Sequence, residues 1–396
     1  MAKAHDMSLF ARIATVYGAL FFSIGMFMPF FPVWLKSQGL DDVQVAWVLA
    51  VQSGTRMVAS PLVSHLADRL GRLRPVMLAC AAGALAGFLW LEMVDGFRAI
   101  MIVVAITFTA FAPLMPLTEA YAVTAGRRHG LDYGRMRLWG SILFIAGNLF
   151  AGAMLDILST GRLVWLLVIA QGALFLALLS LPPRQESRSE EAPRQEPEGE
   201  GRPGFLTAGF VVFLLCAALL QSSHALVYGF SALHWKAQGY SGTVVGLLWG
   251  VGVVAEIVLF WFSGRLMTGL GAVRLLGLAG VAGCVRWTGL SYDPPLVVLF
   301  LLQMLHGFSF GAAHLGAIEF IRRYTPQDRS ATAQAIYGAV AGGIFMTVAT
   351  WASGPLYRAH GAGAWLVMAG MSAVALLLVL LLNRIISPRG RARAAG

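Results

Sequence analysis

The sequence predicts an all-α membrane protein with twelve transmembrane helices, arranged as two six-helix bundles related by pseudo-symmetry. Three observations predict this fold: an apolar composition, twelve apolar runs of spanning length, and polar residues that repeat at an offset of 200 positions. The 396 residues are 58% hydrophobic and 12% charged, whereas a soluble domain is about 25% charged. We therefore expect the chain to be embedded in a lipid bilayer.

Each apolar run is long enough to cross a bilayer, which takes about 20 residues in a helix. No small-residue cleavage site follows the first run, so we expect it to be retained as the first helix. The runs lie at 10–34, 44–66, 74–94, 98–121, 135–157, 162–181, 205–233, 242–264, 272–290, 295–318, 331–356 and 362–384.

A segment rich in Pro, Glu and Arg separates the sixth run from the seventh. Residues 182–204 contain no apolar side chain except one Ala, so they cannot bury surface. This composition predicts a flexible cytoplasmic linker. We expect an N-terminal bundle at 1–181 and a C-terminal bundle at 205–396.

The net charge of +10 indicates topology and not nucleic-acid binding. With the N-terminus inside, 22 of the 29 Lys and Arg residues fall in inside segments, and cytoplasmic loops of membrane proteins retain such residues. We expect a multi-pass protein of a bacterial-type inner membrane with both termini cytoplasmic.

The two halves align without a gap when 200 is added to the residue number. Matches of charged and amide residues at one constant offset are improbable in so apolar a chain, and they indicate a tandem duplication. They pair Lys36 with Lys236, Gln38 with Gln238, Gly39 with Gly239, Gly71 with Gly271, Arg74 with Arg274, Gly83 with Gly283 and Glu119 with Glu319.

The segment Ser64–Arg74, between the second and third runs, resembles the loop signature of major facilitator transporters. That superfamily has two parallel six-helix repeats and binds substrate between them. The resemblance implies a cytoplasmic latch made of Asp68, Arg69, Gly71 and Arg72, although the same bases also serve as inside anchors. Ser64 departs from the first Gly of the signature, and the second half lacks the acid.

Ionisable residues inside apolar runs are costly and are functional candidates. Arg56 and Glu256 occupy equivalent places in the two halves. They are either a functional pair or a structural salt bridge, and the sequence leaves both interpretations open. We expect Glu119 to pair with Arg135 or Arg137, since residues two apart face different sides of a helix.

Glu119, the run Tyr133–Arg137, Glu256, Arg286 and His306 resemble residues of the lactose permease in order and helix. The resemblance implies that Glu119 and Arg137 hold substrate. It implies that Glu256, Arg286 and His306 serve sugar binding and proton coupling. Ser309 stands where the lactose permease has its proton-bearing Glu, so coupling must use another acid.

A further resemblance, to the phenylpropionate permease family, covers nearly the whole chain. It implies proton-coupled uptake of an aromatic carboxylate such as 3-phenylpropionate. It is carried by Trp34–Lys36, Pro116–Thr118, Arg137–Ser141, His224–Ala225, Tyr228–Ala232, Gly239–Ser241, Val253–Glu256, Val285–Trp287, Leu305–His306 and His314–Leu315.

Residue chemistry is compatible with an acid as substrate. A buried carboxylate needs a fixed cation, and Arg137 and Arg286 can each supply a bidentate guanidinium. Glu256 or Glu119 could carry the proton, and His306 and His314 could relay it. Trp139, Tyr228, Trp249 and Trp287 either wall an aromatic substrate or serve packing.

The sequence thus predicts a monomeric secondary transporter for a small organic anion, with protons as the coupling ion and no other cofactor. A proton-coupled sugar symporter and a drug or metabolite efflux antiporter are the alternatives. Gly250–Ala255 lacks the β-α-β context of a dinucleotide site, and no phosphate loop accompanies it. We find no clustered metal or nucleophile signature, so we expect no enzyme, no metal site and no nucleic-acid partner.

Overall fold

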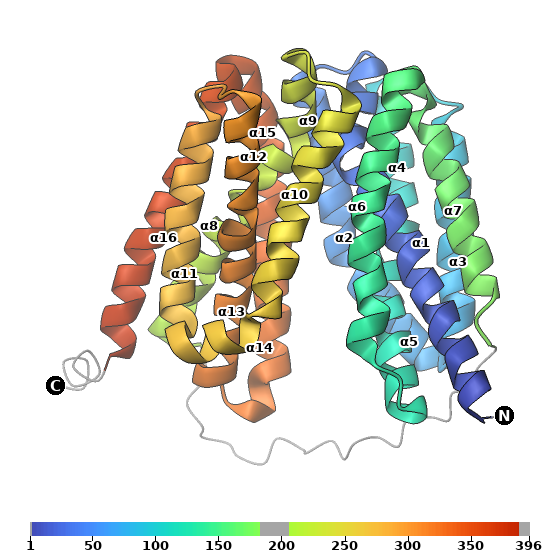
Figure 1. The fold of residues 1–396 in the computed structure, drawn as a ribbon, viewed down its shortest axis with the longest axis horizontal. Coiled ribbons are helices and arrows are strands. Elements are labelled where there is room, and N and C mark those ends of the chain that lie inside the picture. The colour runs from blue at the N-terminus through green and yellow to red at the C-terminus, as the bar shows by residue number, and fades with distance from the viewer. Residues whose placement is uncertain (1, 183–205, 388–396) are drawn as a thin grey trace. The chain divides into compact units, whose positions relative to one another are not determined.

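The computed structural model describes residues 2–182 and 206–387, with side chains described from Met7 onward. These residues form helices and no strand (Figure 1). The predicted linker lies outside the described residues except for Pro182. Its flexibility therefore stays a prediction.

Residues 2–182 form seven α-helices. The fourth predicted run is broken between α4 and α5, because Pro113 and Pro116 cannot donate backbone hydrogen bonds. The helices are α1 (Ala2–Ser37), α2 (Asp42–Leu70), α3 (Leu73–Leu91), α4 (Phe97–Phe111), α5 (Leu114–His129), α6 (Tyr133–Ile157) and α7 (Leu163–Leu179), with a 3-10 turn, η1 (Thr160–Arg162), before α7.

The second half has more interruptions. Its seventh predicted run is divided at Ser223 and His224, and two later runs contain π-helical segments, which often occur at functional sites. The elements are α8 (Ala208–Ser222), α9 (Ala225–Ala237), α10 (Gly242–Trp261), α11 (Ser263–Leu290), α12 (Leu296–Met304), η2 (Gly307–Ala312), α13 (Ala313–Tyr324), η3 (Gln327–Arg329), α14 (Ser330–Tyr337), η4 (Gly338–Phe345), α15 (Met346–His360), η5 (Gly361–Ala364) and α16 (Trp365–Ile386).

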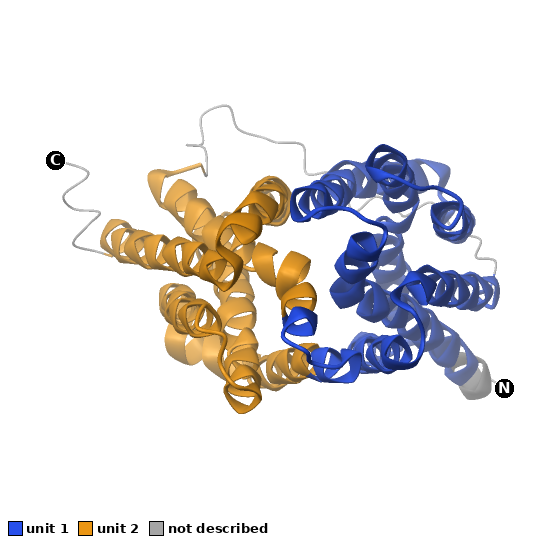
Figure 2. Cartoon of the chain, turned by 90° about the horizontal axis from the view of Figure 1, so that it is seen from above, with its two compact units in different colours: residues 1–200, 235–247 blue, residues 201–234, 248–396 orange. Residues whose placement is uncertain are grey.

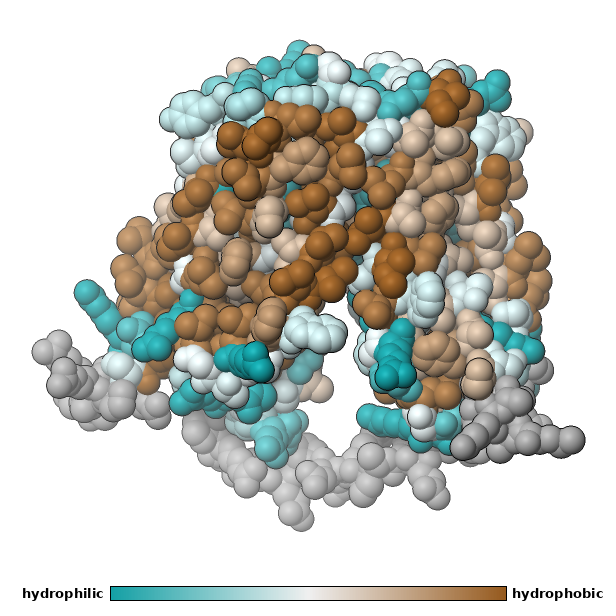
Figure 3. Space-filling view, in the orientation of Figure 1, coloured by the Kyte–Doolittle hydropathy of each residue, from teal (hydrophilic) through white to brown (hydrophobic). Residues whose placement is uncertain are grey.

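All twelve predicted runs are helical over most of their length. Ten stretches among the described residues are long and apolar enough to cross a membrane. One of them, Gln327–Ile386, covers the last two predicted runs and is interrupted by η5, while α2 is helical but is not among the ten. Figure 3 shows hydrophobic side chains over the middle of the helices and hydrophilic ones toward their ends. The all-helical membrane fold is confirmed.

Backbone conformation repeats at the offset that the sequence indicates. Gly39 and Gly239 have φ of 82° and 89°, and Gly71 and Gly271 have φ of 61° and 72°. Helix α2 begins at Asp42 and α10 at Gly242. Positive φ suits glycine because it has no Cβ. The same turns at equivalent places support the duplication.

Contacts divide the chain into two compact units (Figure 2). Unit 1 comprises residues 1–200 and 235–247, and unit 2 comprises 201–234 and 248–396. The first residues of α10 belong to unit 1 because they pack closely on α6. A Cβ on Gly152 would lie 2.2 Å from the carbonyl oxygen of Gly242.

Glycines also set the distance between α1 and α6 in unit 1. A Cβ on Gly25 would lie 2.2 Å from the carbonyl oxygen of Phe144, and one on Gly147 would lie 2.3 Å from that of Phe22. Small residues allow this backbone approach, which maximises van der Waals contact where lipid supplies no hydrophobic drive. The crossing fixes α6, which carries Arg137, against α1.

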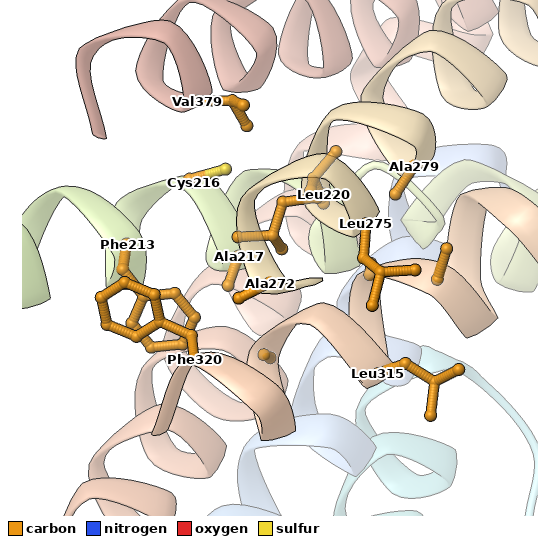
Figure 4. Close-up of a cluster of buried hydrophobic side chains, with 14 of the residues drawn as sticks. Phe213, Cys216, Ala217, Leu220, Ala272, Leu275, Ala279, Leu315, Phe320 and Val379 are labelled. Carbon is orange, nitrogen blue, oxygen red and sulfur yellow. The ribbon is translucent and has the colours of Figure 1, made fainter. Parts of the chain in front are cut away.

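The core of unit 2 is a cluster of buried apolar side chains from α8, α11, α13 and α16 (Figure 4). Phe213 stacks on Phe320 with ring centroids 4.1 Å apart. Cys216 lies within the cluster, and all three cysteines of the chain are free. This core holds α11, which carries Arg286.

Candidate functional site

The first candidate cluster lies in unit 1 and centres on the Glu119 carboxylate of α5. Arg137 Nε lies 2.9 Å from Glu119 Oε1, and Tyr17 donates its hydroxyl to Oε2 at 2.8 Å. Tyr133 donates a second hydroxyl hydrogen bond to the same oxygen. The guanidinium of Arg137 also lies over the ring of Phe21, with Cζ 4.4 Å from its centroid. The carboxylate is therefore held by three donors from two helices, α1 and α6.

Local sequence explains why Arg137, and not Arg135, faces Glu119. Asp132 caps the start of α6 by accepting a hydrogen bond from the backbone of Arg135. The side chain of Arg135 turns to the same Asp132, with Nε 3.4 Å from its carboxylate. Arg137, two residues on, projects to another side of the helix. The predicted pairing of Glu119 with one arginine of this run is confirmed.

The second candidate cluster lies in unit 2 and centres on Arg286 of α11, which is 1% exposed. Its Nη1 donates to His306 Nδ1 at 3.0 Å and to Ser309 Oγ at 3.1 Å. Its Nη2 donates to Gln303 Oε1 at 2.6 Å. The guanidinium lies over Trp287, with Cζ 4.6 Å from the ring centroid. The cation is thus surrounded by neutral acceptors and an aromatic face.

These contacts determine the tautomer of His306. Arginine has donors only, so His306 Nδ1 must accept, and the proton of the neutral ring lies on Nε2. That atom lies 3.6 Å from Glu256 Oε2 on α10. Gly307 permits the approach, since a Cβ there would lie 2.7 Å from the carbonyl oxygen of Ala255. A proton on the imidazole therefore faces the carboxylate.

His224 extends the same network to the break between α8 and α9. Its Nδ1 lies 3.1 Å from the carbonyl oxygen of Leu220, so Nδ1 carries the proton in the neutral ring. Its Nε2 then accepts from Ser309 Oγ at 3.2 Å. Ser309 accepts from Arg286 and donates to His224. The serine that replaces the expected acid is therefore a hydrogen-bond bridge.

The four aromatic residues predicted to wall a substrate differ in burial and in contacts. Tyr228 and Trp249 have ring centroids 6.0 Å apart, and Tyr228 stacks on His224. Trp287 is fully buried, stacks on Trp365 and donates to a serine hydroxyl at the α8–α9 break. Trp139 is 46% exposed and makes no ring contact with the Glu119 cluster among the described residues. Trp287 thus has packing contacts, and a substrate role for any of these aromatic residues stays a prediction.

Three further predictions concern residues outside these networks. His314 contacts Phe260 and Phe310 by its ring, and its relay role stays a prediction. Asp68 lies exposed at the end of α2, and no ion pair of Asp68, Arg69 or Arg72 occurs within residues 7–182. The latch around Gly71 therefore stays a prediction.

Arg56 lies on α2 in unit 1 and Glu256 on α10 in unit 2. Their expected pairing across the halves joins two units and stays a prediction.

Sequence reasoning missed Tyr17, Gln303 and the role of His224. Tyr17 looks like an ordinary aromatic of an apolar run, so only the structure could show its contact with Glu119. Gln303 gave a usable signal, because it is a polar residue in the middle of an apolar run, one helical turn before His306. Metal-binding groups of three or more His, Cys, Asp or Glu are absent from the described residues.

The sequence is similar to known proteins over most of its length. A family model described as the MFS_1 like family matches residues 10–368. A protein of Escherichia coli (strain K12), named as a probable 3-phenylpropionic acid transporter, is 34% identical over 377 residues, which cover 92% of this chain and 96% of the relative.

Two other similarities are lower in identity. The lactose permease of Citrobacter freundii is 26% identical over 385 residues, which cover 90% of this chain and 89% of the relative. The crystal structure of the nucleoside transporter NupG superposes with a TM-score of 0.80 at 16% identity, over 94% of this chain and 98% of that one. At that identity the superposition shows a common fold.

Proposed function

The chain belongs to the MFS_1 like family, and from that premise we propose that it takes up a small aromatic carboxylate together with protons, by alternating access. It is a multi-pass membrane transporter and not an enzyme. A 3-phenylpropionate-like acid is the proposed substrate, and protons are the proposed coupling ion, with no other cofactor. We propose that it acts as a monomer in the inner membrane with both termini cytoplasmic.

The observation that carries the proposal is the state of Arg286. Its guanidinium is buried and bonds to side chains of Gln303, His306 and Ser309, which are neutral acceptors. Among the described residues, no Asp or Glu forms an ion pair with it. A buried cation is costly unless a counter-charge pairs with it. An anionic substrate supplies that charge, and a planar guanidinium suits a carboxylate.

The name of the Escherichia coli relative supports the aromatic acid as the substrate class. Tyr228 and Trp249 lie next to the Arg286 network through His224 and offer aromatic surface near the cation. This combination of fixed cation and aromatic rings suits a ligand with a carboxylate at one end and a ring at the other.

The contact of Glu256 with His306 supports the proton-coupling part. A carboxylate closed off from water is costly when charged, so protonation of Glu256 favours the closed intermediate. The His306 ring links this acid to Arg286, so the charge of Glu256 and the occupancy of Arg286 act on one hydrogen-bond network. A proton on Glu256 and an anion at Arg286 would then be carried together.

Uptake into proteoliposomes tests the function. Labelled 3-phenylpropionate is offered with an acidic outer medium and an alkaline lumen, and we expect accumulation above the outer concentration. Arg286→Lys should abolish accumulation, because lysine lacks the planar fork, whereas Arg323→Lys, near the end of α13, should behave like wild type. Uptake that is absent, or that is indifferent to the pH gradient, would overturn the substrate or the coupling claim respectively.

A sugar symporter is the second candidate, favoured by the Glu119 cluster. Two tyrosine hydroxyls, a carboxylate and a guanidinium gather there, and such groups suit sugar hydroxyls. The lactose permease among the relatives points the same way. Competition of a galactoside against labelled 3-phenylpropionate separates the two. An efflux antiporter is distinguished by substrate leaving against the proton gradient.

A further inference from the structure

Two neighbouring buried side chains in unit 2 each have a nitrogen donor without an acceptor. Arg286 Nε and Gln303 Nε2 make no hydrogen bond with the described residues, although both atoms are inaccessible to solvent. Gln303 itself is 3% exposed. Leaving a buried donor unsatisfied costs free energy, so such pairs are rare without a reason. Each of the two side chains does make another hydrogen bond, through a different atom.

The two donors are held beside each other by that other bond. Gln303 Oε1 accepts from Arg286 Nη2 at 2.6 Å. Arg286 Nε shares its Cζ with Nη2, and Gln303 Nε2 shares its Cδ with Oε1. Each unsatisfied nitrogen is therefore two covalent bonds from an atom of the short hydrogen bond. The two N–H groups lie close together but are closed off in this conformation, so a ligand reaches them when the site opens.

Another arginine of unit 2 shows what this edge of a guanidinium binds when a carboxylate is present. Arg322 Nε and Nη2 donate to the two oxygens of Glu319, each at 2.7 Å. At Arg286 the corresponding Nη2 is bonded to the amide oxygen of Gln303, and Nε has no acceptor. The Gln303 amide thus occupies Nη2, one of the two donors on this edge of the guanidinium. Its own nitrogen, Nε2, adds another donor beside Nε.

We propose that Gln303 and Arg286 together form the carboxylate receptor of this transporter, in which Gln303 determines specificity for an anion. The oxygens of the ligand carboxylate accept from Arg286 Nε–H and from Gln303 Nε2–H, while Gln303 Oε1 keeps its bond to Nη2. The inference rests on the proposed function, because it assigns a second recognition residue to the same site.

The chemistry of the two donors defines the ligand class. Both positions require acceptors, and the formal charge of Arg286 favours an anion over a neutral amide or alcohol. A neutral carboxamide ligand has one acceptor oxygen and would turn its own N–H toward one of the two donors. The receptor therefore selects a carboxylate from an amide of the same shape.

The test compares binding of 3-phenylpropionate and 3-phenylpropionamide to purified protein by isothermal titration. Wild type should prefer the acid. Gln303→Glu keeps an acceptor for Nη2 but replaces the donor by an anion, so we expect acid affinity to fall at least 100-fold. Preference for the acid over the amide should fall at least ten-fold. Gln303→Leu loses the donor without adding charge, and its acid affinity should fall about ten-fold.

A purely positioning role for Gln303 gives a different result. If the side chain only fixes Arg286, Gln303→Leu keeps the wild-type preference for the acid over the amide, and that outcome overturns the proposal. Thermal unfolding without ligand checks the fold. Gln303→Glu should keep its melting temperature because Arg286 pairs with the new carboxylate. The matched control Gln171→Glu, buried in unit 1 beside Ser23, should melt lower.

Failure of the proposed function looks different from failure of this inference. Absence of acid binding by wild type contradicts the substrate class itself. Acid binding by wild type that Gln303→Glu and Gln303→Leu both retain contradicts only the role of Gln303. If Gln303→Glu does not fold, the ten-fold loss expected for Gln303→Leu remains the test, and unchanged binding by that variant overturns the proposal.

Discussion

The crossing of α1 and α6 gives the most direct test of the fold, through the substitution Gly147→Ala. The new methyl carbon would lie 2.3 Å from the backbone oxygen of Phe22, whereas ordinary contact begins at 3.4 Å. The obstacle is backbone, so no side-chain rotation relieves it. Helix α6 must move away from α1 by about 1 Å, and the neighbouring contact at Gly25 must loosen with it.

The size of the effect follows from overpacking in a close-packed interface, which costs about 1–3 kcal/mol. For a body of about 200 residues, each kcal/mol lowers the melting temperature by roughly 2–4 °C. At about 2 kcal/mol, the middle of that range, we expect Gly147→Ala to melt about 4–8 °C below wild type. The control is Gly172→Ala within α7, where nothing lies within 4 Å of an added Cβ. That change should be neutral or stabilise by up to about 1 kcal/mol, because alanine favours the helix.

The assay is thermal unfolding of detergent-purified protein at one fixed heating rate, followed by tryptophan fluorescence and helical circular dichroism. The reasoning requires the two alanine variants to move in opposite directions, or at least to differ by more than 3 °C. Equal melting temperatures for Gly147→Ala and Gly172→Ala would refute the close backbone approach of α1 and α6.

Three other predictions concern charged groups. Glu256→Gln should bind 3-phenylpropionate but fail to accumulate it, because the amide cannot take up the coupled proton; gradient-driven accumulation equal to wild type would contradict this. Arg137→Lys should weaken binding at least ten-fold in a titration, since lysine cannot hold Glu119 through a planar fork; unchanged affinity would remove it from the site. Asp156→Ala should lower the melting temperature more than Asp156→Asn does. The Asp156 carboxylate accepts a hydrogen bond from the backbone N–H of Gly242 at 2.5 Å and caps α10, which stabilises the fold by about 1–2 kcal/mol. If both variants melt at the wild-type temperature, the cap is contradicted.

The helical fold was predictable because the apolar runs that cause it are distributed over the whole chain. Every apolar run long enough to span a bilayer is helical in the structure, since lipid offers no partner for free backbone groups. The pairing of Glu119 with either Arg135 or Arg137 was also predictable, because it needs one acid, one base and the geometry of a single helix start. These features depend on composition and on short-range spacing.

The interruptions of the helices were less predictable. The run 205–233 contains four consecutive polar residues, Gln221 to His224, and the helix ends at Ser222 and resumes at Ala225. The composition marks this place, but it does not show that Ser223 and His224 bond to Trp287 and Ser309. The π-helical segment after His306 has no pattern of its own in the sequence either.

The partners of Arg286 show why a candidate site is only half visible in a sequence. Its charge inside an apolar run marked it as a candidate, and His306 was a candidate by resemblance. Gln303 and His224 join it through contacts between distant segments, which hydropathy and spacing cannot resolve. Ser309 seemed only to lack an expected acid, whereas in the structure it bridges Arg286 to His224.

The left-handed glycines at Gly39, Gly71, Gly239 and Gly271 bear on the ancestry of the molecule. A left-handed turn is costly for any residue with a Cβ. Two unrelated segments would therefore seldom acquire such turns independently at matching places. The bends are then older than the fusion that joined the two copies. The ancestral gene would have encoded one six-helix subunit, and its duplication left each copy free to specialise.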